Sequence, residues 1–123
     1  MIKSKSLFDP VDAVMDGTRV IVAGGFPEDY SSYHEHWPEL GPTKKLLYDY
    51  KYHGLPWEQY EIVFFKLMKG HRAQRKIREL AERSHVGEII TLLCWERSDE
   101  HCHRRLVKQL IEEKRDETNS AVR

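Results

Sequence analysis

The feature that most constrains the fold of this chain is the continuous apolar run at residues 89–93. A polar loop and the start of a helix come directly after it. Gly87 precedes the run, and its residues are mainly β-branched or leucine. This pattern is typical of a strand covered on both faces, as in a parallel sheet. Ser98 or Asp99 can cap the next helix, which carries an apolar stripe at helical spacing: Leu106, Val107, Leu110 and Ile111.

Two further strands are predicted, at residues 2–8 and 19–23, and helices are predicted between residues 42 and 86. A long helical connection between two strands fits a right-handed crossover and parallel pairing. We therefore predict a single α/β domain at residues 1–114, with a small, mostly parallel sheet flanked by helices in a three-layer, Rossmann-like arrangement. Residues 115–123 are polar and are predicted to form a disordered tail.

Both cysteines lie beside the strand at residues 89–93. Cys94 follows the strand, while Cys102 and His103 precede Leu106 and Val107 by one helical turn and should point inward. Ligands of open α/β sheets bind beyond the carboxyl ends of strands, next to helix N-termini. The candidate catalytic residues are therefore Cys94, Glu96, Cys102 and His103, and the candidate ligand-binding residues are Arg104, Gly24, Gly25 and Ser98.

These residue types suit an anion site and an activated thiol, because a helix N-terminus and a nearby arginine attract anions and lower the pKa of a cysteine. Plainer roles fit them too: buried cysteine is a common core residue, and His103 can be a core histidine with its hydrogen bonds satisfied. Zinc ligands usually come as close pairs, and only Cys102 and His103 approach that spacing. We predict no metal and no cofactor, and no permanent disulfide.

The composition indicates a globular protein whose charges balance, with 20 basic and 20 acidic residues. No apolar segment is long enough to span a membrane, and the first 15 residues lack an apolar signal region, so we expect a cytoplasmic protein. A basic cluster stands out against the zero net charge, and it could contact nucleic acid or form a solvated helix face: Arg72, Arg75, Lys76 and Arg78.

Several motifs together resemble the family called domain of unknown function 488 (DUF 488), in its short YeaO-like branch. The resemblance covers nearly the whole chain, through residues 5–10, 16–22, 37–42, 57–60 and 91–93. Its most specific part pairs residues 94–96 (Cys-Trp-Glu) with residues 102–104 (Cys-His-Arg). The resemblance implies an α/β fold and a site at Cys94, Glu96, Cys102, His103 and Arg104.

One segment departs from the family pattern. YeaO-like proteins carry an arginine-bearing Trp-Pro-Arg-Gly segment after the second strand, and residues 24–29 stand there in this chain. The two arginine positions fall on Gly24 and Glu28. If those arginines bind the ligand of the family, this chain has lost or moved that contact.

Three hypotheses for function follow. The first is a thiol-dependent enzyme that acts on a small anion or nucleotide, with Cys94 or Cys102 as nucleophile or redox thiol. The second is a non-catalytic module that binds a nucleotide or nucleic acid through the anion pocket or the basic helix. The third is a protein-binding module in which the Cys–His cluster is structural and the aromatic segment at residues 30–37 contacts a partner.

Overall fold

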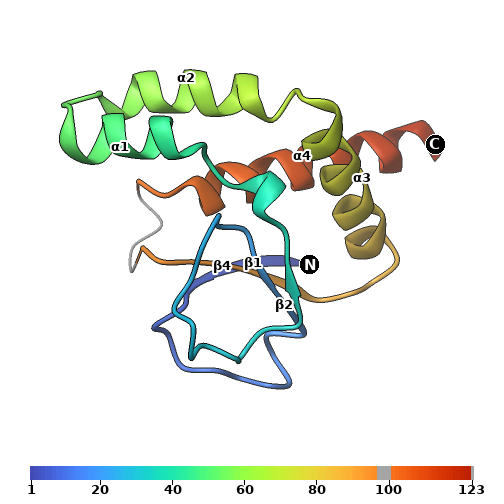
Figure 1. The fold of residues 1–123 in the computed structure, drawn as a ribbon. Coiled ribbons are helices and arrows are strands. Elements are labelled where there is room, and N and C mark those ends of the chain that lie inside the picture. Colours follow the sequence, from blue (N-terminus) through green and yellow to red (C-terminus); the bar gives the residue numbers. More distant parts are fainter. Residues whose placement is uncertain (97–100, 123) are drawn as a thin grey trace.

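A parallel sheet forms the centre of the computed structural model, which describes residues 1–96 and 101–122. In these residues the strands are β1 (Ile2–Ser6), β2 (Thr18–Ile21), β3 (Glu35–His36) and β4 (Ile90–Cys94), in the order β1-β4-β2-β3. Every neighbouring pair is parallel. The predicted α/β domain with a mostly parallel sheet is therefore confirmed (Figure 1). The sequence missed β3, because two residues inside a long loop carry no strand pattern.

The helices follow the predicted order. They are the 3-10 helix η1 (Pro38–Leu40) and the α-helices α1 (Lys44–Tyr52), α2 (Trp57–Leu67), α3 (His71–His85) and α4 (His103–Val122). Thr43 caps α1, because its hydroxyl accepts a hydrogen bond from the Leu46 N–H at 3.1 Å. None of the helices in the described ranges combines the length and the apolar character that a membrane crossing requires.

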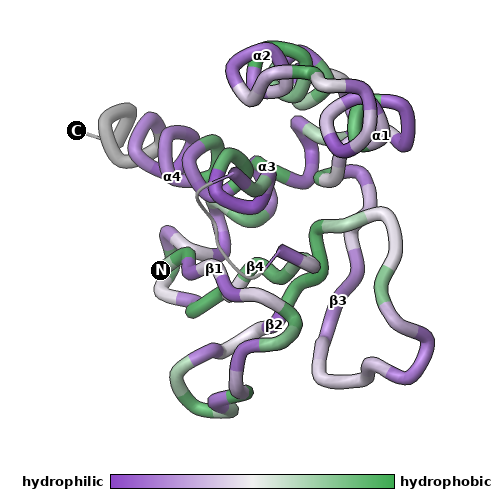
Figure 2. Tube along the Cα trace, turned by 90° about the vertical axis from the view of Figure 1, so that its left-hand side faces the viewer, coloured by the Kyte–Doolittle hydropathy of each residue, from purple (hydrophilic) through white to green (hydrophobic). Residues whose placement is uncertain are grey.

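The α-helices gather on one face of the sheet, and irregular segments cover the other (Figures 1 and 2). The main core joins Val20, Val22, Ile90 and Leu92 of the sheet region to the inner faces of all four α-helices. A second cluster joins Ile21 and Leu93 to the loop aromatics Phe26, Tyr30 and Tyr33. The third layer of the fold therefore consists of loops, where flanking helices were expected.

The C-terminal region differs from its prediction. Helix α4 continues to Val122, where the sequence predicted a disordered tail from residue 115. Arg115 explains part of the difference: its Nη1 donates a hydrogen bond to the Ser84 Oγ at 3.2 Å, at the end of α3. This tertiary contact supports the helix beyond Ile111, the last apolar residue of its stripe. The polar composition of the segment did not predict this contact.

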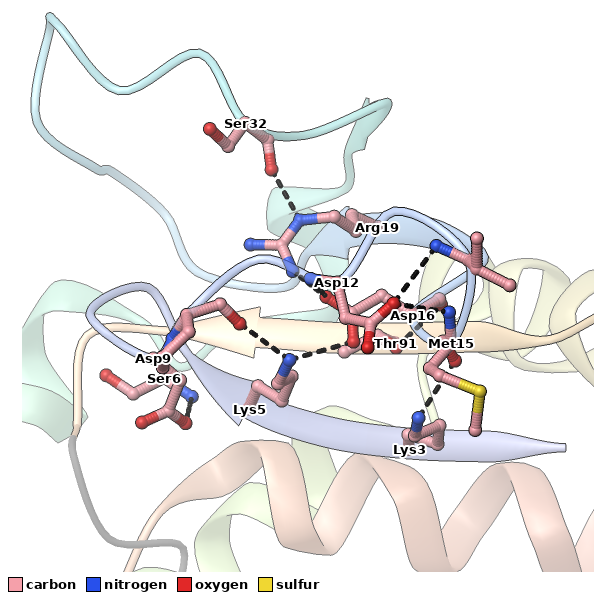
Figure 3. A network of polar contacts seen from close by, with 12 residues as sticks. Lys3, Lys5, Ser6, Asp9, Asp12, Met15, Asp16, Arg19, Ser32 and Thr91 are labelled. Atoms are coloured by element: carbon pink, nitrogen blue, oxygen red, sulfur yellow. Dashed lines mark hydrogen bonds and ion pairs between the residues drawn. The ribbon is translucent and has the colours of Figure 1, made fainter.

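A buried carboxylate, Asp16, fixes the loop layer to the sheet (Figure 3). Its side chain accepts hydrogen bonds from Lys5 Nζ on β1, at 2.8 Å, and from Arg19 Nη1 on β2. Its backbone carbonyl accepts a bond of 2.7 Å from the Thr91 hydroxyl on β4. Asp16 thus joins three strands at one point.

Arg19 extends this network into the second loop. Its Nε donates to the Ser32 carbonyl at 2.6 Å, and its Nη2 donates to the Tyr30 hydroxyl at 2.7 Å. Gly17, beside the network, has a φ of +61°, and a Cβ there would lie 2.2 Å from the Ile89 carbonyl oxygen. A glycine is therefore required where the chain turns from Asp16 into β2.

We predict that Asp16→Asn lowers the free energy of unfolding by about 3–5 kcal/mol at neutral pH, because it leaves Arg19 buried beside a neutral group. Burial opposes ionisation of Asp16, but hydrogen bonds from Lys5, the backbone and Arg19 outweigh it and hold its pKa below the usual value. This stabilisation is present above the unfolded-state pKa of about 3.9 and is lost as the pH falls through the lower folded-state pKa. Urea titrations at several pH values measure it.

Asp29→Asn is the matched control, because Asp29 is an exposed aspartate of the loop layer. A loss for Asp16→Asn no larger than for this control would contradict the proposed role of the network. The difference between the Asp16→Asn variant and the wild type should shrink as the pH falls below 4.

Candidate functional site

The carboxyl ends of β2 and β4 meet the start of α4, as the predicted parallel pairing requires. Cys94 ends β4 and is 1 % exposed, and Cys102 is 2 % exposed just before α4. The Val22 N–H donates to the Leu93 carbonyl at 3.0 Å, which continues the pairing of β2 and β4 to this edge. Two cysteines from different elements are thereby buried together.

His103 ties the first turn of α4 to the end of β2. Its Nε2 donates a hydrogen bond to the Val22 carbonyl at 2.7 Å, across 81 residues of sequence. Burial lowers the pKa of His103 to about 4, although the bond to Val22 opposes this shift. The ring is therefore neutral at pH 7, and with Nε2 protonated its Nδ1 is an acceptor. Nδ1 lies 4.0 Å from the Cys102 Sγ.

Arg104 brings a buried positive charge to the two sulfurs. Its Nη1 lies 3.2 Å from the Cys94 Sγ and 3.8 Å from the Cys102 Sγ, and it also donates to the Glu96 carbonyl. The residue is only 2 % exposed, so its charge is buried with the two sulfurs. Among the described residues, its buried Nε has no hydrogen-bond partner.

The two thiols lie beside one guanidinium, and their pKa values shift in opposite directions. A hydrogen bond from the Cys102 thiol lowers the pKa of Cys94, and the charge of Arg104 adds to this effect against the opposing influence of burial. The same pairing with Cys94, together with burial, raises the pKa of Cys102. Cys94 is therefore the more acidic thiol of the pair, and Cys102 is the less acidic one.

The sulfurs of Cys94 and Cys102 and a ring nitrogen of His103 lie within 4.8 Å of one another, so three groups of the kind that bind zinc are gathered here. However, the Arg104 guanidinium already contacts both sulfurs. A second cation at the same sulfurs would be repelled by it at short range. The cation that contacts both sulfurs in this structure is therefore the guanidinium of Arg104.

A cavity of about 470 Å³ adjoins this cluster, between the end of β2, helix α1 and the residues after β4. Four predicted site residues line it: Gly24, Gly25, Glu96 and His103. A Cβ added at Gly24 or Gly25 would meet no atom within 4 Å, so the backbone is open there. Trp95 forms part of the wall, with its Nε1 donating to the Gly25 carbonyl at 2.6 Å.

The sequence analysis missed the two lysines that line the cavity. Lys44 and Lys51 stand seven residues apart on α1 and both border the cavity. Their spacing places them on one face of a helix. The sequence predicted this helix but gave no sign of which face would cover the strand ends.

Ser98, the remaining predicted ligand-binding residue, lies outside the described residues. The predicted basic cluster lies on α3, where Arg72, Arg75 and Arg78 are exposed. Lys76 Nζ lies 3.9 Å from the centre of the Trp37 ring, in a cation–π contact. A shallow pocket of about 340 Å³ on this surface is lined by Glu39, Arg72, Arg75, Lys76 and Glu79, so its charges are mixed.

Comparisons with known proteins give one match. Neither the curated proteins nor the solved structures include a match to this chain. A family model described as the active DUF488-N3 subclade matches residues 2–115, and this match does not distinguish the YeaO-like branch, which stays a prediction. Since the matched range includes the sheet, all the helices up to residue 115 and both halves of the Cys–His–Arg cluster, the chain belongs to the DUF488 family, in its DUF488-N3 subclade.

Proposed function

We propose that this protein is a thiol-dependent enzyme that acts on a small anionic molecule, with Cys94 as its nucleophile. The single observation that carries the proposal is the contact of 3.2 Å between Arg104 Nη1 and the Cys94 Sγ, beside a cavity with two lysines. Thiolates, not thiols, are the nucleophiles of cysteine enzymes, and a neighbouring guanidinium stabilises the thiolate. The description of the subclade as active is in keeping with catalysis.

The cavity suggests the class of substrate. Lys44 and Lys51 supply positive charge, and the N-terminus of α1 at Lys44 adds its dipole. Phe26, Leu47 and Trp95 supply an apolar wall. A molecule with an apolar body and an anionic group fits both, and a nucleotide is one such molecule.

The other predicted site residues have separate roles in this proposal. Glu96 lines the cavity and is placed to exchange a proton with the substrate, while the open backbone at Gly24 and Gly25 allows close approach of the ligand. His103 is a positioning residue, because its bond to Val22 fixes Cys102 and Arg104 at the end of β2. Two free cysteines suit a reducing compartment, so a cytoplasmic location is part of the proposal.

We predict that Cys94 in the folded protein is alkylated by iodoacetamide with a pH midpoint below the usual value of about 8.5. Arg104→Met should raise this midpoint by about one to three pH units, because it removes the adjacent positive charge while keeping an extended side chain. Mass spectrometry of each cysteine peptide across a pH series measures both midpoints. The rate at the plateau reports access to the buried sulfur, and the midpoint reports its ionisation.

Arg105→Met is the matched control, because Arg105 is the exposed neighbour and pairs with Glu61 at 3.4 Å. Its alkylation midpoint should equal that of the wild type. If Cys94 reacts only after the protein is unfolded, the thiol mechanism is wrong.

We predict that the folded protein binds phenyl phosphate more tightly than phenol, which has the same ring and oxygen without the anionic group. The double substitution Lys44→Gln with Lys51→Gln should weaken phenyl phosphate binding about tenfold, equivalent to ~1.4 kcal/mol. Isothermal titration calorimetry measures the dissociation constants. Lys45→Gln is the control, because Lys45 is 85 % exposed on the same helix, pairs with Asp49 and does not line the cavity. Equal losses in both variants would contradict an anion site in the cavity.

The second candidate function is nucleic-acid binding through α3, which the exposed arginines Arg72, Arg75 and Arg78 favour. If each contacts one phosphate of a single strand, replacing all three by alanine should reduce the slope of log K against log salt by about two. Fluorescence anisotropy of a labelled oligonucleotide at several salt concentrations measures the slope. An unchanged slope would exclude this surface, and Arg105→Ala serves as the single-charge control.

A further inference from the structure

We propose that Cys94 and Cys102 form a reversible dithiol–disulfide couple that is oxidised by hydrogen peroxide or another small hydroperoxide. This inference rests on the ionised Cys94 of the proposed function and adds an electron-transfer reaction to it. The two free cysteines belong to different elements, and their sulfurs lie within 4.8 Å of each other.

The geometry assigns a different role to each sulfur. Cys94 contacts Arg104 at 3.2 Å, so it is the thiolate that attacks the oxidant. Cys102 is its hydrogen-bond donor and lies farther from the guanidinium, at 3.8 Å. Cys102 is therefore the resolving thiol, which attacks the oxidised Cys94 in the second step.

The reaction balances in two steps. The Cys94 thiolate attacks the terminal oxygen of the hydroperoxide, the O–O bond breaks, and the leaving alkoxide or hydroxide takes a proton from water. Cys94 is then a sulfenic acid. The Cys102 sulfur attacks it, the S–O bond breaks, and the hydroxyl leaves as water with the Cys102 proton. Two sulfurs have lost two electrons to the hydroperoxide. Two equivalents of a small thiol, or one dithiol, return the disulfide to two thiols by exchange and are themselves oxidised to a disulfide.

Burial determines the size of the oxidant. Cys94 and Cys102 are 1 % and 2 % exposed, so a bulky disulfide such as oxidised glutathione should react more slowly than a small hydroperoxide. Hydrogen peroxide is close to water in size. The cavity adjoins the two sulfurs, because two of its lining residues contact the cluster. The Glu96 carbonyl accepts a hydrogen bond from Arg104, and the His103 ring contacts Cys102.

Oxidation would also change the partner of Arg104. A disulfide carries no charge, so the guanidinium loses the thiolate that balances it in the reduced protein. The disulfide also removes the nucleophile, and the oxidised protein should be inert to alkylation.

The test treats the reduced, chelator-washed full chain with one equivalent of hydrogen peroxide, followed by mass spectrometry of intact protein and peptides. We expect the loss of two hydrogens, a single peptide containing Cys94 linked to Cys102, and full reversal by dithiothreitol. Oxidised glutathione should act at least tenfold more slowly. Dimedone should label Cys94 in the Cys102→Ser variant, because the sulfenic acid there has no resolving thiol.

Several outcomes would overturn the couple: no linked peptide in the wild type, a disulfide between two chains, or zinc that stays bound and protects both thiols. The wild-type measurement stands even if the Cys102→Ser variant fails to fold. A low alkylation midpoint for Cys94 without a linked peptide would overturn the couple and leave the proposed function intact. A linked peptide in a protein that does not bind phenyl phosphate would support the couple and contradict the proposed function.

Discussion

The buried carboxylate of Asp16 is the interaction on which the loop face of this fold depends. A sheet with helices on only one side must cover its other side with irregular chain, and irregular chain carries polar backbone groups that need partners. Asp16 fastens the irregular chain to the sheet and supplies such partners. Its side chain accepts hydrogen bonds from Lys5 and Arg19, and its backbone carbonyl accepts one from the Thr91 hydroxyl. Charged side chains thus help to hold the loop layer against the sheet, in addition to its small set of apolar contacts.

This layer also contributes to the geometry of the site. Arg19 binds the Ser32 carbonyl and the Tyr30 hydroxyl, and the same segment carries Phe26, which lines the cavity. The Gly25 carbonyl accepts a hydrogen bond from Trp95, so the end of the loop after β2 is fastened to the residues after β4. The loop after β2 therefore contacts the Asp16–Arg19 network at the amino end of β2 and also lines the cavity at the carboxyl end of β2.

At the site, Arg104 places its positive charge against both cysteine sulfurs. A guanidinium is always charged and offers several donors, so it stabilises a thiolate without removing it as a nucleophile. His103 is neutral, because its burial outweighs the hydrogen bond to Val22. In the Cys-His-Arg segment, Arg104 thus contacts both sulfurs, whereas His103 fastens the start of α4 to Val22.

Patterns of apolar residues close together in the sequence predicted most of the secondary structure and part of the site. The run at residues 89–93 predicted β4 within one residue, and the step of one helical turn from Leu106 and Val107 correctly predicted the burial of Cys102 and His103. The segment at residues 35 and 36 could not be predicted as β3, because its strand character comes only from pairing with Val20 and Ile21. The contact of Arg115 with Ser84 is likewise invisible in the local sequence.

The sequence by itself determined the parallel α/β class, since an apolar run and a long helical crossover leave few other arrangements. It also determined that both cysteines meet at one edge of the sheet. The tertiary structure alone decided that Lys44 and Lys51 face that edge, that Arg104 contacts the Cys94 sulfur, and that the second sheet face is covered by loops around Asp16. The physical reason is that local periodicity fixes which side of an element is buried, whereas contacts between distant elements depend on how those elements pack together.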